Sequence, residues 1–165
     1  MHSLIVIRRT NVNYIEPTSQ PTLQPLPANP FPDETGFRET ILVVEDEAFV
    51  REVVCEILAD AGYRVLKARN AAEAAAAFRR CHRAVRLLLT DVVLPDQNGR
   101  DLAKALRTIG PGLKTLFMSG YPENAVTRQG QLEEGMFYLS KPFSAQSLMR
   151  KVKQVLAENL EEVVI

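Results

Sequence analysis

The sequence is poor in the residues that build disulfide frameworks and zinc sites. Its 165 residues include two cysteines, Cys55 and Cys81, and two histidines, His2 and His82. The cysteines lie far apart and neither has a CxxC partner, so we interpret them as packing residues rather than as a disulfide or a thiolate cage. Zinc prefers nitrogen and sulfur ligands, and two isolated histidines supply too few of them. Any metal bound by this chain is therefore expected to have oxygen ligands.

The chain also lacks net charge and long apolar runs. Lysine plus arginine and aspartate plus glutamate number 20 each, so no overall field would steer it toward nucleic acid or an anionic membrane. No apolar run approaches the roughly 18 residues of a membrane-spanning helix, and Leu4–Ile7 is too short for a signal peptide. These absences predict a cytoplasmic globular protein that does not enter a membrane.

A proline-rich stretch sets the N-terminal segment apart from the rest of the chain. Six prolines fall between Pro17 and Pro32, a composition that neither nucleates a helix nor supplies a ladder of donors. We interpret residues 1–39 as a Pro-rich arm or linker, expected to be flexible, residues 40–160 as one domain, and residues 161–165 as a tail. No helix-turn-helix follows, so direct DNA binding is not expected.

From Thr40 onward, short β-branched runs alternate with helical periodicity. We expect strands at 41–44, 63–68, 86–90, 113–118 and 136–139, each followed by a helix. The first helix should end at Gly62, the fourth should follow Pro122, and Ser144 should cap the last. The apolar stripes expected to face the sheet are Val50, Val53, Val54, Ile57, Leu58 and Ala61 in the first helix, and Leu102, Ala105, Leu106 and Ile109 in the third. Repeated βα units of this kind predict an α/β fold around a parallel sheet.

Charged and hydroxyl side chains follow the expected strands. The acids Glu45, Asp46 and Asp91 come at strand ends, as do Ser119 and Lys141. Ligands of open α/β sheets bind outside the carboxyl ends of the strands. Two carboxylates about 4 Å apart repel by roughly 4 kcal/mol at an effective dielectric constant near 20, and Mg²⁺ is a fitting counter-charge. This combination favours phosphoryl transfer with Asp91 as the acceptor.

Four separated segments carry a family resemblance: Ile41–Glu47, Leu89–Gly99, Phe117–Tyr121 and Ser140–Phe143. In their order and spacing they resemble the receiver domain of two-component response regulators, over about residues 40–160. The resemblance implies a flavodoxin-like doubly wound five-stranded parallel sheet of strand order 2-1-3-4-5 with five helices. Periodicity by itself predicts only the parallel sheet.

The same resemblance implies a metal site and a phosphoacceptor. Asp91 would accept a phosphoryl group from a phosphohistidine of a sensor histidine kinase or histidine phosphotransfer protein. Asp46, Asp91 and the backbone carbonyl of Val93 would ligate Mg²⁺, with help from Glu45. The domain would catalyse only its own phosphorylation and slow dephosphorylation, so we do not classify it as an enzyme.

Three further residues are implied in phosphoryl binding and switching. Ser119 and Lys141 would each bind a phosphoryl oxygen, and Tyr138 would move inward as Ser119 shifts. The helix after Pro122, the strand through Tyr138 and the last helix would form a face for a downstream protein partner. A homodimer is a further possibility that the sequence leaves open.

Three alternatives have to be weighed against this interpretation. A flavin module needs a loop that cradles phosphate, which the Glu45–Glu47 acids would repel. A phosphohydrolase usually has a second acid two residues after its nucleophile, where this chain has Val93. The third alternative is a receiver-like interaction module that is never phosphorylated. Val93 and Tyr121, two positions beyond Asp91 and Ser119, are expected to slow hydrolysis of the aspartyl phosphate.

Overall fold

The structure is a computed structural model that describes residues 39–120 and 136–158. The predicted arm, apart from Glu39, and the predicted tail lie outside the described residues. The helix expected after Pro122 also lies outside them. The described elements are β1 Thr40–Val44, α1 Ala48–Asp60, β2 Arg64–Ala68, α2 Ala71–Cys81, β3 Val85–Asp91, α3 Gly99–Ile109, β4 Lys114–Ser119, β5 Met136–Ser140 and α5 Ala145–Ala157.

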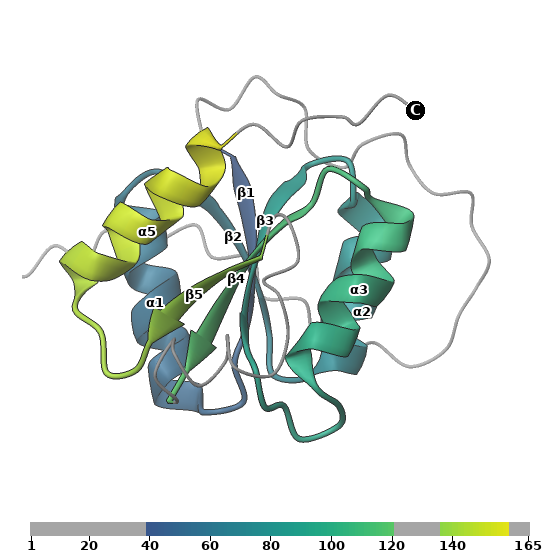
Figure 1. Ribbon diagram of the computed structural model, residues 1–165, viewed down its shortest axis with the longest axis horizontal. Coiled ribbons are helices and arrows are strands. Elements are labelled where there is room, and N and C mark those ends of the chain that lie inside the picture. The colour runs from purple at the N-terminus through teal and green to yellow at the C-terminus, as the bar shows by residue number, and fades with distance from the viewer. Residues whose placement is uncertain (1–38, 121–135, 159–165) are drawn as a thin grey trace, which may run out of the picture.

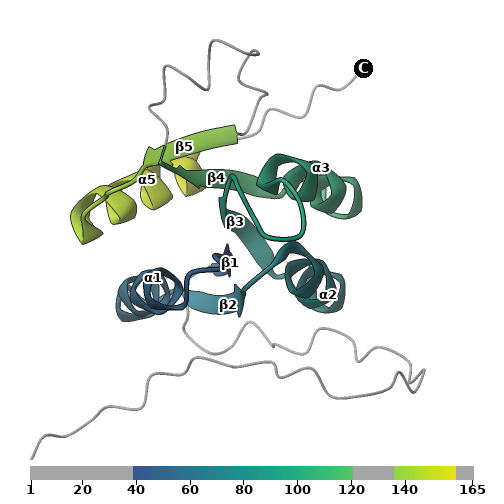
Figure 2. The ribbon, with the colours of Figure 1, turned by 90° about the horizontal axis from the view of Figure 1, so that it is seen from below.

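A five-stranded parallel sheet forms the centre of the fold, with strand order β2-β1-β3-β4-β5. This is the order that the resemblance implies. Helices α1 and α5 cover one face of the sheet, and α2 and α3 cover the other (Figures 1 and 2). Four of the five expected helices therefore lie within the described residues.

Strand β1 shows why its sequence is an unbroken apolar run. Successive side chains of a strand point to opposite faces of the sheet. Ile41 and Val43 pack into the core cluster that contains residues of α1 and α5, whereas Leu42 and Val44 pack into the cluster with residues of α2 and α3. All four are fully buried, as expected for a parallel strand covered on both faces.

The expected helix stripes were partly wrong. Val53 and Ile109 are 37% and 40% exposed, and Ala105 is also exposed. Helix α1 buries Val54, Cys55 and Leu58, and α3 buries Ala103 between Leu102 and Leu106. Each helix contacts the sheet along only one stripe of its surface. Small shifts of that stripe, which depend on tertiary packing, place residues at its border in solvent.

The expected helix boundaries are largely confirmed. Gly62 follows α1 with a positive φ of 87°, a conformation that glycine adopts readily. Ser144 and Ser147 form a reciprocal capping box at the start of α5. Asn70 caps α2 by accepting from the Glu73 amide at 2.8 Å. The carboxylate of Glu73 accepts from the Arg69 amide rather than from the Asn70 amide, so Asn70 and Glu73 do not form a reciprocal capping box.

Within residues 39–120 and 136–158, none of the helices has both the length and the apolar character needed to cross a bilayer.

Candidate functional site

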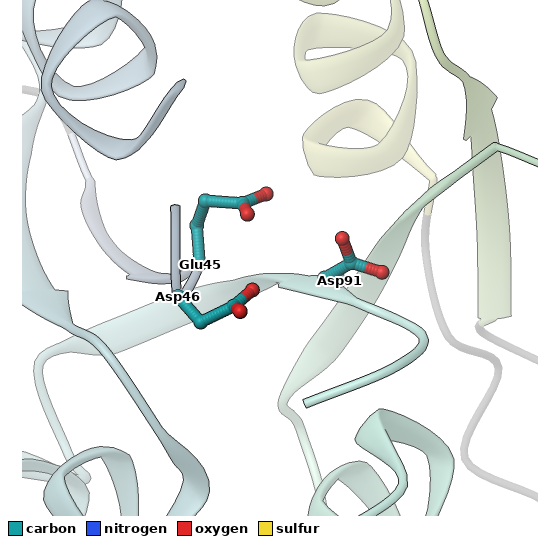
Figure 3. A group of neighbouring side chains, drawn as sticks. All are labelled: Glu45, Asp46 and Asp91. Atoms are coloured by element: carbon teal, nitrogen blue, oxygen red, sulfur yellow. The ribbon is translucent and has the colours of Figure 1, made fainter. Parts of the chain in front are cut away.

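Three carboxylates meet at the carboxyl edge of the sheet. Glu45 and Asp46 follow β1, and Asp91 ends β3. The two strands are parallel neighbours, with Val44 of β1 paired to Thr90 of β3. One carboxylate oxygen from each residue lies within 4.8 Å of the other two. Figure 3 shows the three side chains turning toward a common space. The expected convergence of these acids is therefore confirmed.

The Lys141 ammonium contacts two of these three carboxylates. Its ammonium nitrogen lies 2.6 Å from Asp91 Oδ2 and 2.7 Å from Glu45 Oε2. Its backbone amide donates to the Ser119 carbonyl at 2.6 Å, which fixes the start of the loop after β5 against the end of β4. One positive charge thus contacts two of the three carboxylates, and the third, Asp46, is exposed.

Burial and hydrogen bonding shift two pKa values in the site. Burial raises the pKa of Glu45, whose residue is 1% exposed, although hydrogen bonds from Lys141 and the Glu47 amide act in the opposite direction. Partial burial alone would lower the pKa of Lys141. The hydrogen bonds to Asp91 and Glu45 outweigh it, and the pKa of Lys141 is raised. Lys141 is therefore charged at neutral pH.

The donor set fits a hard divalent cation. Three carboxylates lie together and one lysine contacts two of them, which leaves excess negative charge, and all the available ligand atoms are oxygens. Mg²⁺ is commonly held by one or two carboxylates with waters and phosphate oxygens. Glu45, Asp46 and Asp91 could hold such an ion together.

The loop after Asp91 is ordered around the same carboxylate. The Val93 amide donates to Asp91 Oδ1 at 3.0 Å, and Val93 forms an isolated bridge with Asn98. Val93 is 65% exposed, so its bulk stands at the surface beside Asp91. The role of its carbonyl as a metal ligand stays a prediction.

Ser119 and Tyr138 belong to β4 and β5, the two strands at the edge of the sheet that also carries Lys141. Ser119 ends β4, is 3% exposed and pairs with Ser140 of β5. The Tyr138 ring is buried and stacks on Phe117 with centroids 5.1 Å apart. The Arg100 guanidinium carbon lies 5.7 Å from the centre of the Tyr138 ring. The structure places Tyr138 inward, and its movement as a switch stays a prediction.

Two residues near the site carry contacts that the sequence analysis did not assign. Arg51, in the first turn of α1, donates to backbone carbonyls of the acidic loop. A cation near a helix N-terminus is a signal that could have been noticed, because the helix dipole disfavours it. Asp96 accepts from the amides of Ala71 and Ala72 at 3.0 and 2.9 Å. No local sequence signal shows that contact, because the partners lie 25 and 24 residues away.

The Asp96 contact gives a pH-dependent prediction. The hydrogen bond from the Ala71 amide, joined by that from Ala72, lowers the pKa of Asp96 below its ordinary value, even though some desolvation acts against it. A lowered folded-state pKa contributes stability that is present above the ordinary pKa and is lost as the pH falls through the folded value. Asp96→Asn should therefore lower the midpoint of urea unfolding at neutral pH.

The difference between the wild type and Asp96→Asn should shrink as the pH is lowered through the acid range. Urea unfolding followed by circular dichroism at several pH values measures both effects. Asp60→Asn is the matched control, because that carboxylate is exposed and has no hydrogen-bond partner among the described residues. A loss of stability in Asp96→Asn that stays constant down to acid pH would contradict the assignment.

Comparisons with known proteins agree with this geometry. The family model described as "Response regulator receiver domain" matches residues 41–153. The chain is 36% identical over 117 residues to the sensor kinase CckA of Brucella abortus, covering 71% of this chain and 12% of that protein. It is 32% identical over 116 residues to the response regulator receiver protein CpdR of the same organism, covering 70% of this chain and 95% of that protein.

A solved structure is also similar, that of the response regulator TrrA from Thermotoga maritima in complex with Mg²⁺ and BeF. The TM-score is 0.61 at 28% identity, and the match covers 72% of this chain and 99% of that one. Other curated relatives are longer: the chain spans 24% of the regulator NtrC of Azospirillum brasilense and 52% of the regulator PhoB of Pseudomonas aeruginosa.

Proposed function

Because the chain belongs to the response regulator receiver domain family, we propose that Asp91 accepts a phosphoryl group from a phosphohistidine and thereby switches a protein-interaction face. The donor would be a sensor histidine kinase or a histidine phosphotransfer protein in the cytoplasm. The observation that supports this most directly is the contact of the Asp91 carboxylate with Lys141 beside two further acids.

Both carboxylate oxygens of Asp91 have hydrogen-bond partners that bear on the proposed transfer step. A carboxylate oxygen of Asp91 would form a bond to phosphorus as the phosphorus–nitrogen bond to the donor histidine breaks, and the imidazole leaves with its electron pair and takes up a proton. The Val93 amide, 3.0 Å from Oδ1, holds the carboxylate in place. The Lys141 ammonium, 2.6 Å from Oδ2, carries the charge that would pair with a phosphoryl oxygen.

Glu45, Asp46 and Asp91 are the residues that would hold Mg²⁺, with the Val93 carbonyl as the proposed fourth ligand. When bound, Mg²⁺ supplies positive charge that offsets the negative charge of the phosphoryl oxygens. Ser119, at the buried end of β4, would donate a hydrogen bond from its hydroxyl to a phosphoryl oxygen. These roles imply self-modification followed by slow hydrolysis, not turnover of another substrate.

The test uses the full chain with Mg²⁺ and beryllofluoride, which mimics an aspartyl phosphate. Amide NMR spectra of the wild type should shift around Asp46, Asp91, Ser119 and Lys141. Asp91→Asn retains the size of the side chain and should show no such shifts, because the neutral amide cannot form the bond. Incubation with a small phosphodonor should likewise add one phosphoryl group, seen by intact mass, to the wild type alone.

If neither the wild type nor Asp91→Asn showed shifts with Mg²⁺ and beryllofluoride, the proposal would be overturned. That result would favour an interaction module that is never phosphorylated, and the search for partners would then use the unmodified chain. Equal shifts in the wild type and Asp91→Asn would also contradict it, because the mimic would then be binding elsewhere.

A further inference from the structure

Arg51 connects α1 to the loop that carries two of the acids. Its Nη1 lies 2.7 Å from the carbonyl oxygen of Glu45 and 3.2 Å from that of Asp46. The Arg51 amide also makes the first hydrogen bond of the helix, to the Glu47 carbonyl at 2.9 Å. Backbone and side chain of one residue therefore hold three successive carbonyls.

Helix stability does not account for an arginine at this position. The N-terminal turn of a helix carries partial positive charge, so a cation there is unfavourable and an acid is favourable. Helix α1 has no acid in its first turn, and its N-cap residue Glu47 makes no side-chain cap hydrogen bond. The contacts that Arg51 makes with the loop are a better explanation of its place.

The loop depends on few other contacts. The Glu45 amide donates to the Ala68 carbonyl at 3.1 Å, which holds the loop to the end of β2. Glu45 also has its carboxylate fixed by the Glu47 amide and by Lys141. Asp46 has no hydrogen bond to its carboxylate in the part of the chain that the structure describes. The position of that carboxylate is therefore set by the backbone that Arg51 holds.

We propose that Arg51 is a positioning residue, whose guanidinium fixes the backbone of Glu45 and Asp46 so that their carboxylates converge with Asp91 on a divalent cation. The part of this inference that concerns the cation rests on the proposed function. Arg51 is bonded to carbonyl oxygens and leaves the carboxylate oxygens available as ligands, unlike Lys141, which occupies two of them.

Because Arg51 leaves the carboxylate oxygens free, the proposal can be tested by whether removal of Arg51 strengthens or weakens Mg²⁺ binding. If Arg51 acted only through its charge, then its removal would strengthen Mg²⁺ binding by the acids. If it positions the loop, then its removal weakens Mg²⁺ binding. Partners that orient ligands typically change metal affinity by about 10–100-fold when removed. We therefore expect Arg51→Met to weaken Mg²⁺ binding by about tenfold.

The experiment is a Mg²⁺ titration of the full chain followed by amide NMR, since the chain has no tryptophan for fluorescence. Arg51→Lys keeps the charge but not the planar group of donors, and should bind with intermediate affinity. Arg83→Met removes the same charge from an exposed residue between α2 and β3 and should leave the affinity unchanged. Unaltered or tighter binding in Arg51→Met would overturn the cation part of the proposal.

A second measurement without metal tests the positioning itself. Amide hydrogen exchange at Glu45 and Glu47, whose amides donate to the Ala68 carbonyl and to the Glu45 carboxylate, should be about tenfold faster in Arg51→Met, while the buried amides of β1 and β4 keep their protection. If the wild type does not bind Mg²⁺, the proposed function fails, and exchange at these amides still decides whether Arg51 holds the loop. Unchanged exchange would refute that role.

Discussion

Replacing Lys141 with methionine is expected to tighten Mg²⁺ binding by about tenfold and to abolish the response to beryllofluoride. The ammonium of Lys141 contacts Asp91 Oδ2 and Glu45 Oε2 at 2.6 and 2.7 Å, so it competes with a metal ion for the same oxygens. Methionine has a similar length and no charge, which frees both oxygens for the ion.

The size of this effect follows from the charges involved. Two unit charges 4 Å apart interact by about 4 kcal/mol at an effective dielectric constant near 20. Screening by water reduces that energy, so we expect the change to be about 1.4 kcal/mol, which corresponds to a tenfold change in Mg²⁺ affinity. The opposite effect on beryllofluoride arises because Lys141 is the residue proposed to pair with a phosphoryl oxygen.

Mg²⁺ titrations and beryllofluoride spectra of the same variant measure the two effects. Lys67→Met is the matched control, because it removes one lysine whose partner is the exposed Glu52 rather than the site. The control should leave Mg²⁺ affinity within about twofold of the wild type. A Lys141→Met protein that bound Mg²⁺ less tightly would show that the lysine organises the carboxylates instead of competing for them.

The tightening should also depend on pH. Burial raises the pKa of Glu45, and the hydrogen bond from Lys141 acts against that rise. Without the lysine, Glu45 should retain its proton to a higher pH, and a protonated carboxyl is a poor metal ligand. The gain in Mg²⁺ affinity is therefore expected to diminish as the pH falls.

Gly99→Ala should cause the largest loss of stability among the substitutions considered. A Cβ atom at Gly99 would lie 2.1 Å from the backbone carbonyl oxygen of Asp91 and 3.3 Å from Thr90 Oγ1. The carbonyl is fixed as part of β3, and Thr90 Oγ1 donates to it at 3.0 Å. The Gly99 amide is itself bonded to the Val92 carbonyl at 2.8 Å. Relief of the clash requires α3 to move away from the end of β3.

We expect Gly99→Ala to lower the free energy of unfolding by about 3 kcal/mol, the upper part of the usual range for overpacking. For a domain of this size, that corresponds to a fall of roughly 10 °C in the melting temperature. Because the displaced carbonyl belongs to Asp91, Mg²⁺ affinity of the folded fraction should fall as well. Thermal and urea unfolding by circular dichroism measure the stability.

Gly112→Ala is the control for this substitution. A Cβ at Gly112 meets no atom within 4 Å, and its stability should stay within about 0.5 kcal/mol of the wild type. Equal stability of the two variants would mean that the turn between Asp91 and α3 adjusts without strain, contrary to the close approach seen at Gly99.

The sequence alone determined the parallel sheet and most of the site. Apolar runs such as Ile41–Val44 are local signals of strands buried on both faces. Because the carboxyl ends of parallel strands share one edge, residues directly after each strand could be grouped before any contact was known. Glu45, Asp46, Asp91 and Lys141 meet as expected. The strand order required the resemblance, since periodicity does not say which strands are neighbours.

Only the tertiary structure decided the contacts that position those residues. Asp96 caps a helix that begins 25 residues before it, and Lys141 reaches Glu45 across 96 residues. Arg51 is close in sequence to its partners, but its carbonyl contacts depend on how α1 leaves the sheet. Local patterns record the preferences of neighbouring residues, whereas these contacts depend on packing between distant elements. The exposure of Val53 and Ile109 has the same cause, because the packing of each helix on the sheet decides which border residues reach solvent.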